Sequence, residues 1–240
     1  MKRIVVLIVS LILVGVMITS CTTSTPTPTG TPTSTPTPTP TAKTFTLGLV
    51  LSTLNNPFFV TLRDGAQAEA TKQGVTLIVM DSQNYSAKEA TNIEDLISRK
   101  VDAILVNPTD SDAVVPSITK ANTAKIPVFT IDRGANGGTI VSHIASDNVA
   151  GGKMAGEFLG TALGKKGNVV ELEGIAGTSA ARDRGKGFND VMAASFPDIK
   201  IVAKQTADFD RAKGLSVFEN ILTAQPVSYT HLTLPTIYSV

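Results

Sequence analysis

Several polar and aromatic side chains stand directly after short apolar segments of the sequence. They are Asn56, Phe58 and Phe59 after the first segment, Asn107 after a later one, Asp132 and Arg133 after the next, and Arg182, Arg184 and Phe209 after two more. Aromatic rings pack on C–H faces, whereas carboxylate, amide and guanidinium groups pair with hydroxyls that both donate and accept hydrogen bonds. A site that pairs every hydroxyl discriminates strongly, because a missing partner leaves a buried polar group unsatisfied. The set therefore predicts a site for a small, neutral, polyhydroxylated ligand.

Each of these residues also has a purely structural interpretation. Phe59 lies at helical spacing with other apolar residues and could belong to a core. Asn56 precedes a proline, which is ordinary turn chemistry. Asp132 with Arg133 could form a surface ion pair, and Arg184 could be solvated. Their common position after apolar segments favours the ligand interpretation for the group as a whole.

The elements that would position these side chains alternate regularly from Phe45 onward. Strands are expected at 45–51, 75–80, 103–106, 128–131, 143–145, 169–172 and 199–203. Helices are expected between them, at about 59–70, 86–97, 113–123, 150–163, 180–194 and 211–223, with a capping box of Ser86 and Glu89 opening the second. This alternation predicts an α/β fold of parallel sheets with helices on both faces. Ligands of such sheets bind beyond the carboxyl ends of the strands, where the polar and aromatic residues lie.

The first 44 residues predict export and anchoring rather than a folded domain. Lys2 and Arg3 precede the apolar run 4–18, so we expect a signal peptide over residues 1–20. An uncleaved anchor is the alternative, although the run is short for a membrane span. The run ends at Cys21 in a sequence that resembles a bacterial lipobox, which predicts lipidation of Cys21. Residues 21–44 are rich in Thr and Pro and predict an extended linker. The chain is therefore expected outside the cytoplasm, anchored by lipid in the periplasm or on the outer cell face.

Composition and missing motifs exclude several classes of protein. The formal net charge is +1, without the positive excess of a nucleic-acid-binding protein. Cys21 is the single cysteine, which excludes an internal disulfide and a cysteine-based zinc site. No GxSxG or GxGxxG follows a predicted strand, and the sequence GTALGKK at 160–166 falls short of a phosphate-binding loop. We expect a binding protein, not an enzyme, with no metal and no cofactor.

Seven blocks of the sequence carry the candidate site residues or lie between them: STLNNPFF (52–59), DSQN (81–84), NPTDSDAV (107–114), IDR (131–133), VSHIASDN (141–148), GIAGTSAARDRG (174–185) and ADFDR (207–211). Together they are similar to the periplasmic pentose- and hexose-binding proteins that serve ABC transporters. The resemblance covers residues 45–226 and implies two Rossmann-like lobes, 45–146 and 147–226, that close on a sugar about a hinge. It also implies a monomer that captures ribose or a similar monosaccharide and delivers it to a membrane permease. The alternative is a sensor that presents the sugar to a chemoreceptor or a histidine kinase.

The resemblance also assigns roles to individual residues. Hydrogen bonds to the sugar are implied for Asn56, Asn107, Asp132, Arg133 and Arg184, and stacking on its ring for Phe58, Phe59 and Phe209. Arg182 is implied to be a neighbour of the ligand rather than a main contact, and residues 146–148 to be the first crossover between lobes.

The sequence after Pro226 departs from the preceding pattern. Another apolar strand is expected there, but the chain reads VSYTHLTLPT, which resembles a translated adapter of sequencing libraries. We therefore expect residues 227–240 to be non-native and the C-terminal lobe to be incomplete. A natural divergent terminus is the alternative.

Overall fold

The computed structural model describes residues 44–224. The chain divides into two units, Met1–Thr41 and Ala42–Val240, and every described residue lies in the second. The predicted signal peptide, lipidated Cys21, nearly all of the linker and the tail after Pro226 lie outside the described residues and stay predictions. Within residues 44–224, no helix combines the length and apolar character needed to cross a bilayer.

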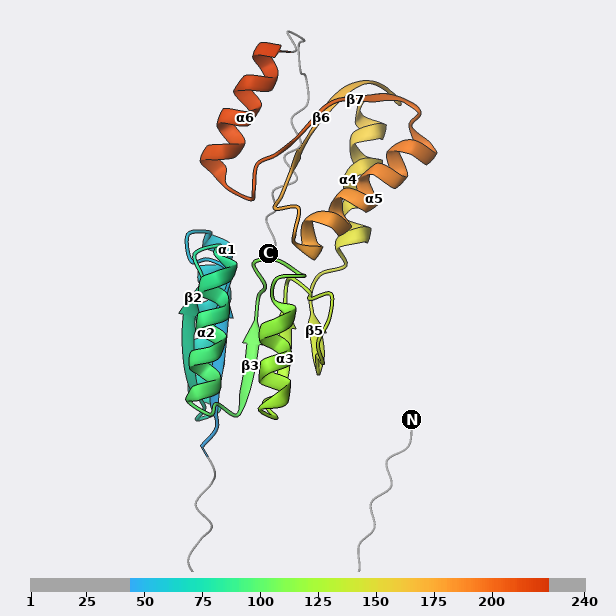
Figure 1. Ribbon diagram of the computed structural model, residues 1–240. Coiled ribbons are helices and arrows are strands. Elements are labelled where there is room, and N and C mark those ends of the chain that lie inside the picture. The colour runs from blue at the N-terminus through green and yellow to red at the C-terminus, as the bar shows by residue number, and fades with distance from the viewer. Residues whose placement is uncertain (1–43, 225–240) are drawn as a thin grey trace, which may run out of the picture. The chain divides into compact units, whose positions relative to one another are not determined.

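The N-terminal lobe is built on a five-stranded parallel sheet (Figure 1). Its strands are β1 (Thr46–Leu51), β2 (Thr76–Asp81), β3 (Ala103–Val106), β4 (Val128–Ile131) and β5 (Ser142–Ile144), in the order β2-β1-β3-β4-β5. Its helices are α1 (Pro57–Lys72), α2 (Ser86–Ser98) and α3 (Val115–Thr123). Alternate residues of β1 enter different cores: Val50 packs with residues of α2 and α3, and Leu49 packs with Phe59 of α1. Both faces of the sheet are therefore covered, as the apolar strands predict.

The C-terminal lobe contains a second parallel sheet of β6 (Lys166–Glu173) and β7 (Asp198–Thr206). The helices α4 (Asn148–Ala162) and α5 (Ser179–Ser195) contribute to the core on one face, and α6 (Arg211–Ala224) to the core on the other. The two helices on the shared face approach closely through glycine: a Cβ on Gly187 would lie 2.0 Å from the Val149 carbonyl oxygen. In the described residues β6 pairs with β7 alone, whereas β1 of the N-terminal lobe pairs on both edges.

The predicted α/β class with parallel sheets is confirmed, and the predicted strands and helices lie within a few residues of the observed ones. The predicted capping box at Ser86 and Glu89 is wrong. Tyr85 is the N-cap of α2 and makes no side-chain capping bond. The Glu89 carboxylate instead accepts a hydrogen bond from the Thr109 amide at 2.6 Å. A buried backbone N–H requires a hydrogen-bond acceptor, and for the Thr109 amide in the loop after β3 that acceptor is the Glu89 carboxylate.

Candidate ligand-binding site

The loop after β1 supplies an amide and two aromatic rings. Asn56 is the N-cap of α1, and its Oδ1 accepts a hydrogen bond from the Phe58 amide at 3.0 Å. The rings of Phe58 and Phe59 then meet edge to face, with centroids 5.1 Å apart. Phe59 is buried against Leu49 and Leu51, as its interpretation as a core residue predicts, while its stacking on a ligand stays a prediction. Phe58 is only partly buried and leaves part of its ring available.

Asn107, at the end of β3, joins three strand ends through its side-chain amide. Its Oδ1 accepts from the Ser52 hydroxyl at 2.6 Å, after β1. Its Nδ2 donates to the Ile131 carbonyl at 3.0 Å and to Asp132 Oδ2 at 3.2 Å, at the end of β4. The side chain is fully buried, and these bonds occupy its donors and its acceptor. Asn107 therefore orients Asp132, while direct contact with a ligand stays a prediction.

Asp132 and Arg133 form a pair at the end of β4 in which Arg133 is buried and Asp132 is partly buried. Arg133 Nε lies 3.9 Å from Asp132 Oδ2, and Arg133 is 2% exposed, so the interpretation of a surface ion pair is wrong. Asp132 has a left-handed φ of 61°, a strained backbone of the kind that occurs at binding sites. Burial raises the pKa of Asp132, although Arg133 and Arg184 oppose the shift. Burial also lowers the pKa of Arg133 to about 10, so the guanidinium remains charged at neutral pH.

The C-terminal lobe contributes a guanidinium and a third aromatic ring. Arg184 on α5 donates from Nε to Asn148 Oδ1 at 2.8 Å. Its guanidinium carbon lies 6.0 Å from the ring centroid of Phe209, which follows β7. Asp208 and Phe209 both have left-handed φ values, 52° and 57°, which marks the loop as strained.

Gly174 is a residue of this site that sequence reasoning did not single out. A Cβ at Gly174 would lie only 2.1 Å from Cζ of Phe209, so the ring rests where a side chain would otherwise stand. The only sequence signal is the position of the glycine directly after β6, within the block GIAG.

The predicted residues from both lobes come together around Arg133. Its guanidinium carbon lies 5.1 Å from the ring centroid of Phe59 and 5.4 Å from that of Phe209. A hydrogen bond also joins the lobes, since the Gly134 amide donates to the Ser179 hydroxyl at 2.8 Å. Arg182 is exposed and donates to the Gly177 carbonyl at 2.9 Å. The geometry thus gathers rings, one carboxylate and two guanidinium groups.

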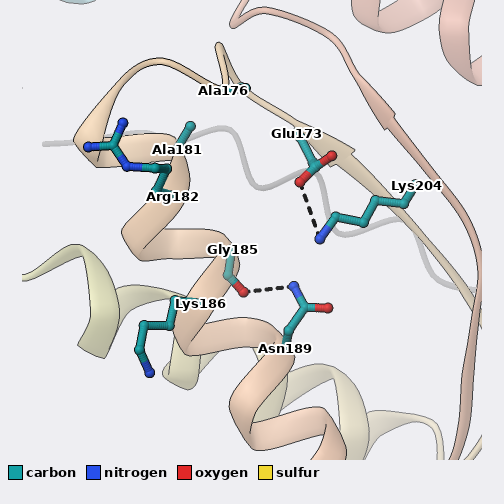
Figure 2. A pocket seen from close by; sticks show the side chains of 9 residues that line it. Glu173, Ala176, Ala181, Arg182, Gly185, Lys186, Asn189 and Lys204 are labelled. Atoms are coloured by element: carbon teal, nitrogen blue, oxygen red, sulfur yellow. Dashed lines mark hydrogen bonds and ion pairs between the residues drawn. The ribbon is translucent and has the colours of Figure 1, made fainter. Parts of the chain in front are cut away.

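A cavity of about 360 Å³ lies in the C-terminal lobe between α5 and the two strands and adjoins this site at Gly174 (Figure 2). Its lining is Glu173, Gly174, Ala176, Ala181, Arg182, Gly185, Lys186, Asn189 and Lys204. Figure 2 shows Lys204 paired with Glu173. Lys204 Nζ lies 3.2 Å from Glu173 Oε1. The lining includes no aromatic side chain, so it does not fit the stacking predicted from the sequence. Among the described residues, no cluster of His, Cys, Asp and Glu could hold a metal ion.

Two parallel sheets flanked by helices, with polar and aromatic side chains at the strand ends of both, define a two-lobed α/β fold of the class in which ligands bind beyond the strand ends. Residues 47–232 match the family described as periplasmic binding protein domain, and the chain belongs to this family. The family is one of binding proteins, which agrees with the expectation that the chain is not an enzyme.

Named relatives and solved structures agree with this assignment. The ribose import binding protein RbsB of Salmonella typhimurium is 58% identical over 181 residues, which are 75% of this chain and 60% of that protein. RbsB of Bacillus subtilis is 50% identical over 184 residues, which are 77% of this chain and 59% of that protein. The solved Caulobacter myo-inositol binding protein bound to myo-inositol is 33% identical with a TM-score of 0.74, and the match covers 78% of this chain and 64% of that one. The chain thus spans about 60% of the length of the curated relatives it matches.

Proposed function

We propose that the chain acts in an extracytoplasmic binding protein that captures ribose, or a similar monosaccharide, and delivers it to an ABC transporter. The observation that carries the proposal is the position of Arg133 between Phe59 of one lobe and Phe209 of the other. A ligand at this place contacts both lobes.

The chemistry of the site fits a sugar ring. Phe58, Phe59 and Phe209 offer ring faces to C–H groups. Asp132 accepts hydrogen bonds from hydroxyls, while Arg133 and Arg184 donate in fixed planar directions. No bond is made or broken, and the function requires only selective capture.

Capture by closure follows from the division of the site between lobes. A sugar that touches both lobes binds the closed arrangement more tightly than the open one and shifts the population toward it. The transporter would then read the closed form. Ribose is favoured over other monosaccharides because the relatives at 50–58% identity are named for ribose import.

The anchoring part of the proposal rests on the sequence alone. A signal peptide over 1–20, lipidation of Cys21 and the Thr/Pro linker would hold a monomeric binding domain at a membrane. Replacement of Cys21 by serine should release the protein from the membrane fraction. Retention of the variant on membranes would contradict lipid anchoring.

A sensor that presents the sugar to a chemoreceptor or a histidine kinase would use the same site. The names of the relatives refer to import and favour transport. A permease and an ATPase encoded beside this gene would support transport, whereas a histidine kinase there would support sensing.

Titration of the ¹⁵N-labelled protein with ribose tests the binding function and detects even weak affinity. We expect saturable shifts of the Asp132 and Arg133 signals, and much smaller shifts with an apolar molecule of similar size. Absence of any saturable change with ribose and with other monosaccharides would contradict the proposal.

A further inference from the structure

Glu89 is a buried acid that does not belong to the predicted set of ligand contacts. It lies one turn into α2 and is 1% exposed. Its Oε2 accepts a hydrogen bond from the Thr109 amide at 2.6 Å. Burial of a carboxylate is costly unless partners compensate for lost water. The identity of those partners indicates what the acid does.

The loop that Glu89 holds carries two groups of the candidate site. Pro108 precedes Thr109, and its carbonyl accepts a hydrogen bond from Arg133 Nη1 at 3.3 Å. Asn107 precedes Pro108, and its amide orients Asp132. The hydroxyls of Ser86 and Thr109 share a further hydrogen bond of 2.9 Å. The first turn of α2 therefore fixes the loop, and the loop in turn fixes Arg133 and Asp132.

Glu89 also contributes to the charge balance of Arg133. Arg133 is almost fully buried, and its closest carboxylate contact, with Asp132, is a long one of 3.9 Å. Glu89 attracts Arg133 as well, whereas the positive charge of Arg184 repels it. The negative charge of Glu89, added to that of Asp132, stabilises the buried guanidinium of Arg133 and helps to hold it in one position.

We propose that Glu89 is a positioning residue for sugar binding, which acts through residues 107–109 to hold Arg133 and Asp132 without touching the sugar. The inference rests on the proposed function, because it names a residue that prepares the same site.

The protonation of Glu89 supplies a signature of this role. Burial raises the pKa of Glu89 to about 7, against the opposing effects of the Thr109 hydrogen bond and of Arg133. The charged groups that act on it are Arg133, which lowers the pKa, and Asp110, which raises it. The ionised form accepts a stronger hydrogen bond and attracts Arg133. Ribose affinity should therefore rise by about twofold to fivefold from about pH 6 to about pH 8, as expected when binding lowers the pKa of Glu89 modestly.

Two substitutions separate positioning from simple structural support. Glu89→Ala removes the acceptor of the Thr109 amide and should weaken ribose binding about tenfold, the usual effect of an unsatisfied buried group. Glu89→Gln keeps the shape and the acceptor but not the charge. It should restore most of the affinity at about pH 6 and abolish the rise toward about pH 8. Glu94→Gln is the matched control, because Glu94 lies on the same helix, is half-exposed and pairs with Lys120. The control should follow the unchanged protein at both pH values.

Measurements without sugar keep the inference separate from the proposed function. The Arg133 Nε–H signal and the exchange rate of the Thr109 amide should change in the Glu89 variants and not in the Glu94 control. An unchanged Arg133 signal in Glu89→Ala, or a Glu89→Gln variant that keeps the pH profile of the unchanged protein, would overturn the inference. If Arg133 shifts in the variants but no form of the protein binds a sugar, only the function fails.

Discussion

Replacement of Gly174 by alanine should displace the Phe209 ring while it leaves the fold intact. The added Cβ would lie 2.1 Å from Cζ and 2.3 Å from Cε1 of the ring. Carbon atoms pack at about 3.5–4.0 Å, so the ring must move by roughly 1.5 Å. The backbone of Gly174 does not require glycine, since its φ lies outside the left-handed region. The three nearest atoms to the added Cβ all belong to the ring, so the ring must yield.

The displaced ring loses its contacts with two guanidinium groups, at 5.4 Å from Arg133 and 6.0 Å from Arg184. Cation–π contacts contribute about 0.5–2 kcal/mol each, so the combined loss is about 1–4 kcal/mol. Ribose affinity should fall by about 5- to 1,000-fold in a titration followed by NMR. The matched control is Gly65→Ala, because a Cβ at Gly65 meets nothing within 4 Å. A Gly174→Ala protein that binds ribose as tightly as the control would refute this reasoning.

Three further predictions concern the site and the fold. Arg133→Ala should weaken ribose binding by about 10- to 100-fold, because it also removes the positive charge adjacent to Asp132, whereas Arg182→Ala should have little effect. Equal ribose affinities of the two variants would remove Arg133 from the site. The stability of the fold should fall with rising pH, because burial raises the pKa of Glu89 from 4.5 to about 7 on folding. That stabilisation is complete below about pH 4.5 and is lost as the pH rises through about 7, a change of about 3 kcal/mol. Urea unfolding should give a lower free energy of unfolding at about pH 8 than at about pH 5 for the unchanged protein, but not for Glu89→Gln. The same fall in both proteins would contradict the assignment of this pH dependence to Glu89. Gly187→Ala should lower the free energy of unfolding by about 1–3 kcal/mol, because its Cβ overlaps the Val149 carbonyl oxygen at 2.0 Å. Gly214→Ala is the control and should leave the free energy of unfolding unchanged, because its Cβ has its nearest contact at 3.8 Å. Equal melting temperatures of the Gly187→Ala and Gly214→Ala variants would contradict the close packing of α4 on α5.

The placement of the site could be predicted from the sequence because parallel strands end at the same edge. Asn107 and Asp132 are far apart in the chain, yet they follow neighbouring strands and lie within hydrogen-bonding distance, at 3.2 Å. Apolar runs of four to six residues located β1, β3 and β4 with little error. Once those strands are placed, the loops that follow them must lie together.

The burial of individual polar groups could not be predicted in this way. Asp132 and Arg133 are adjacent charged residues, and the sequence is equally consistent with an exposed pair and with a buried one. Arg133 is buried because the rings of Phe59 and Phe209 pack against it, and this packing involves residues far apart in the sequence. Glu89 shows the same limit: its spacing from Ser86 fits a capping box, but the Thr109 amide from a distant loop competes for the carboxylate.

A crystal structure of the protein grown with ribose tests the central claim most directly. We expect the sugar between the rings of Phe58 and Phe59 on one side and Phe209 on the other, with hydrogen bonds to Asp132 and Arg133. Ribose in the cavity beside Glu173 and Lys204, or away from both lobes, would contradict the account.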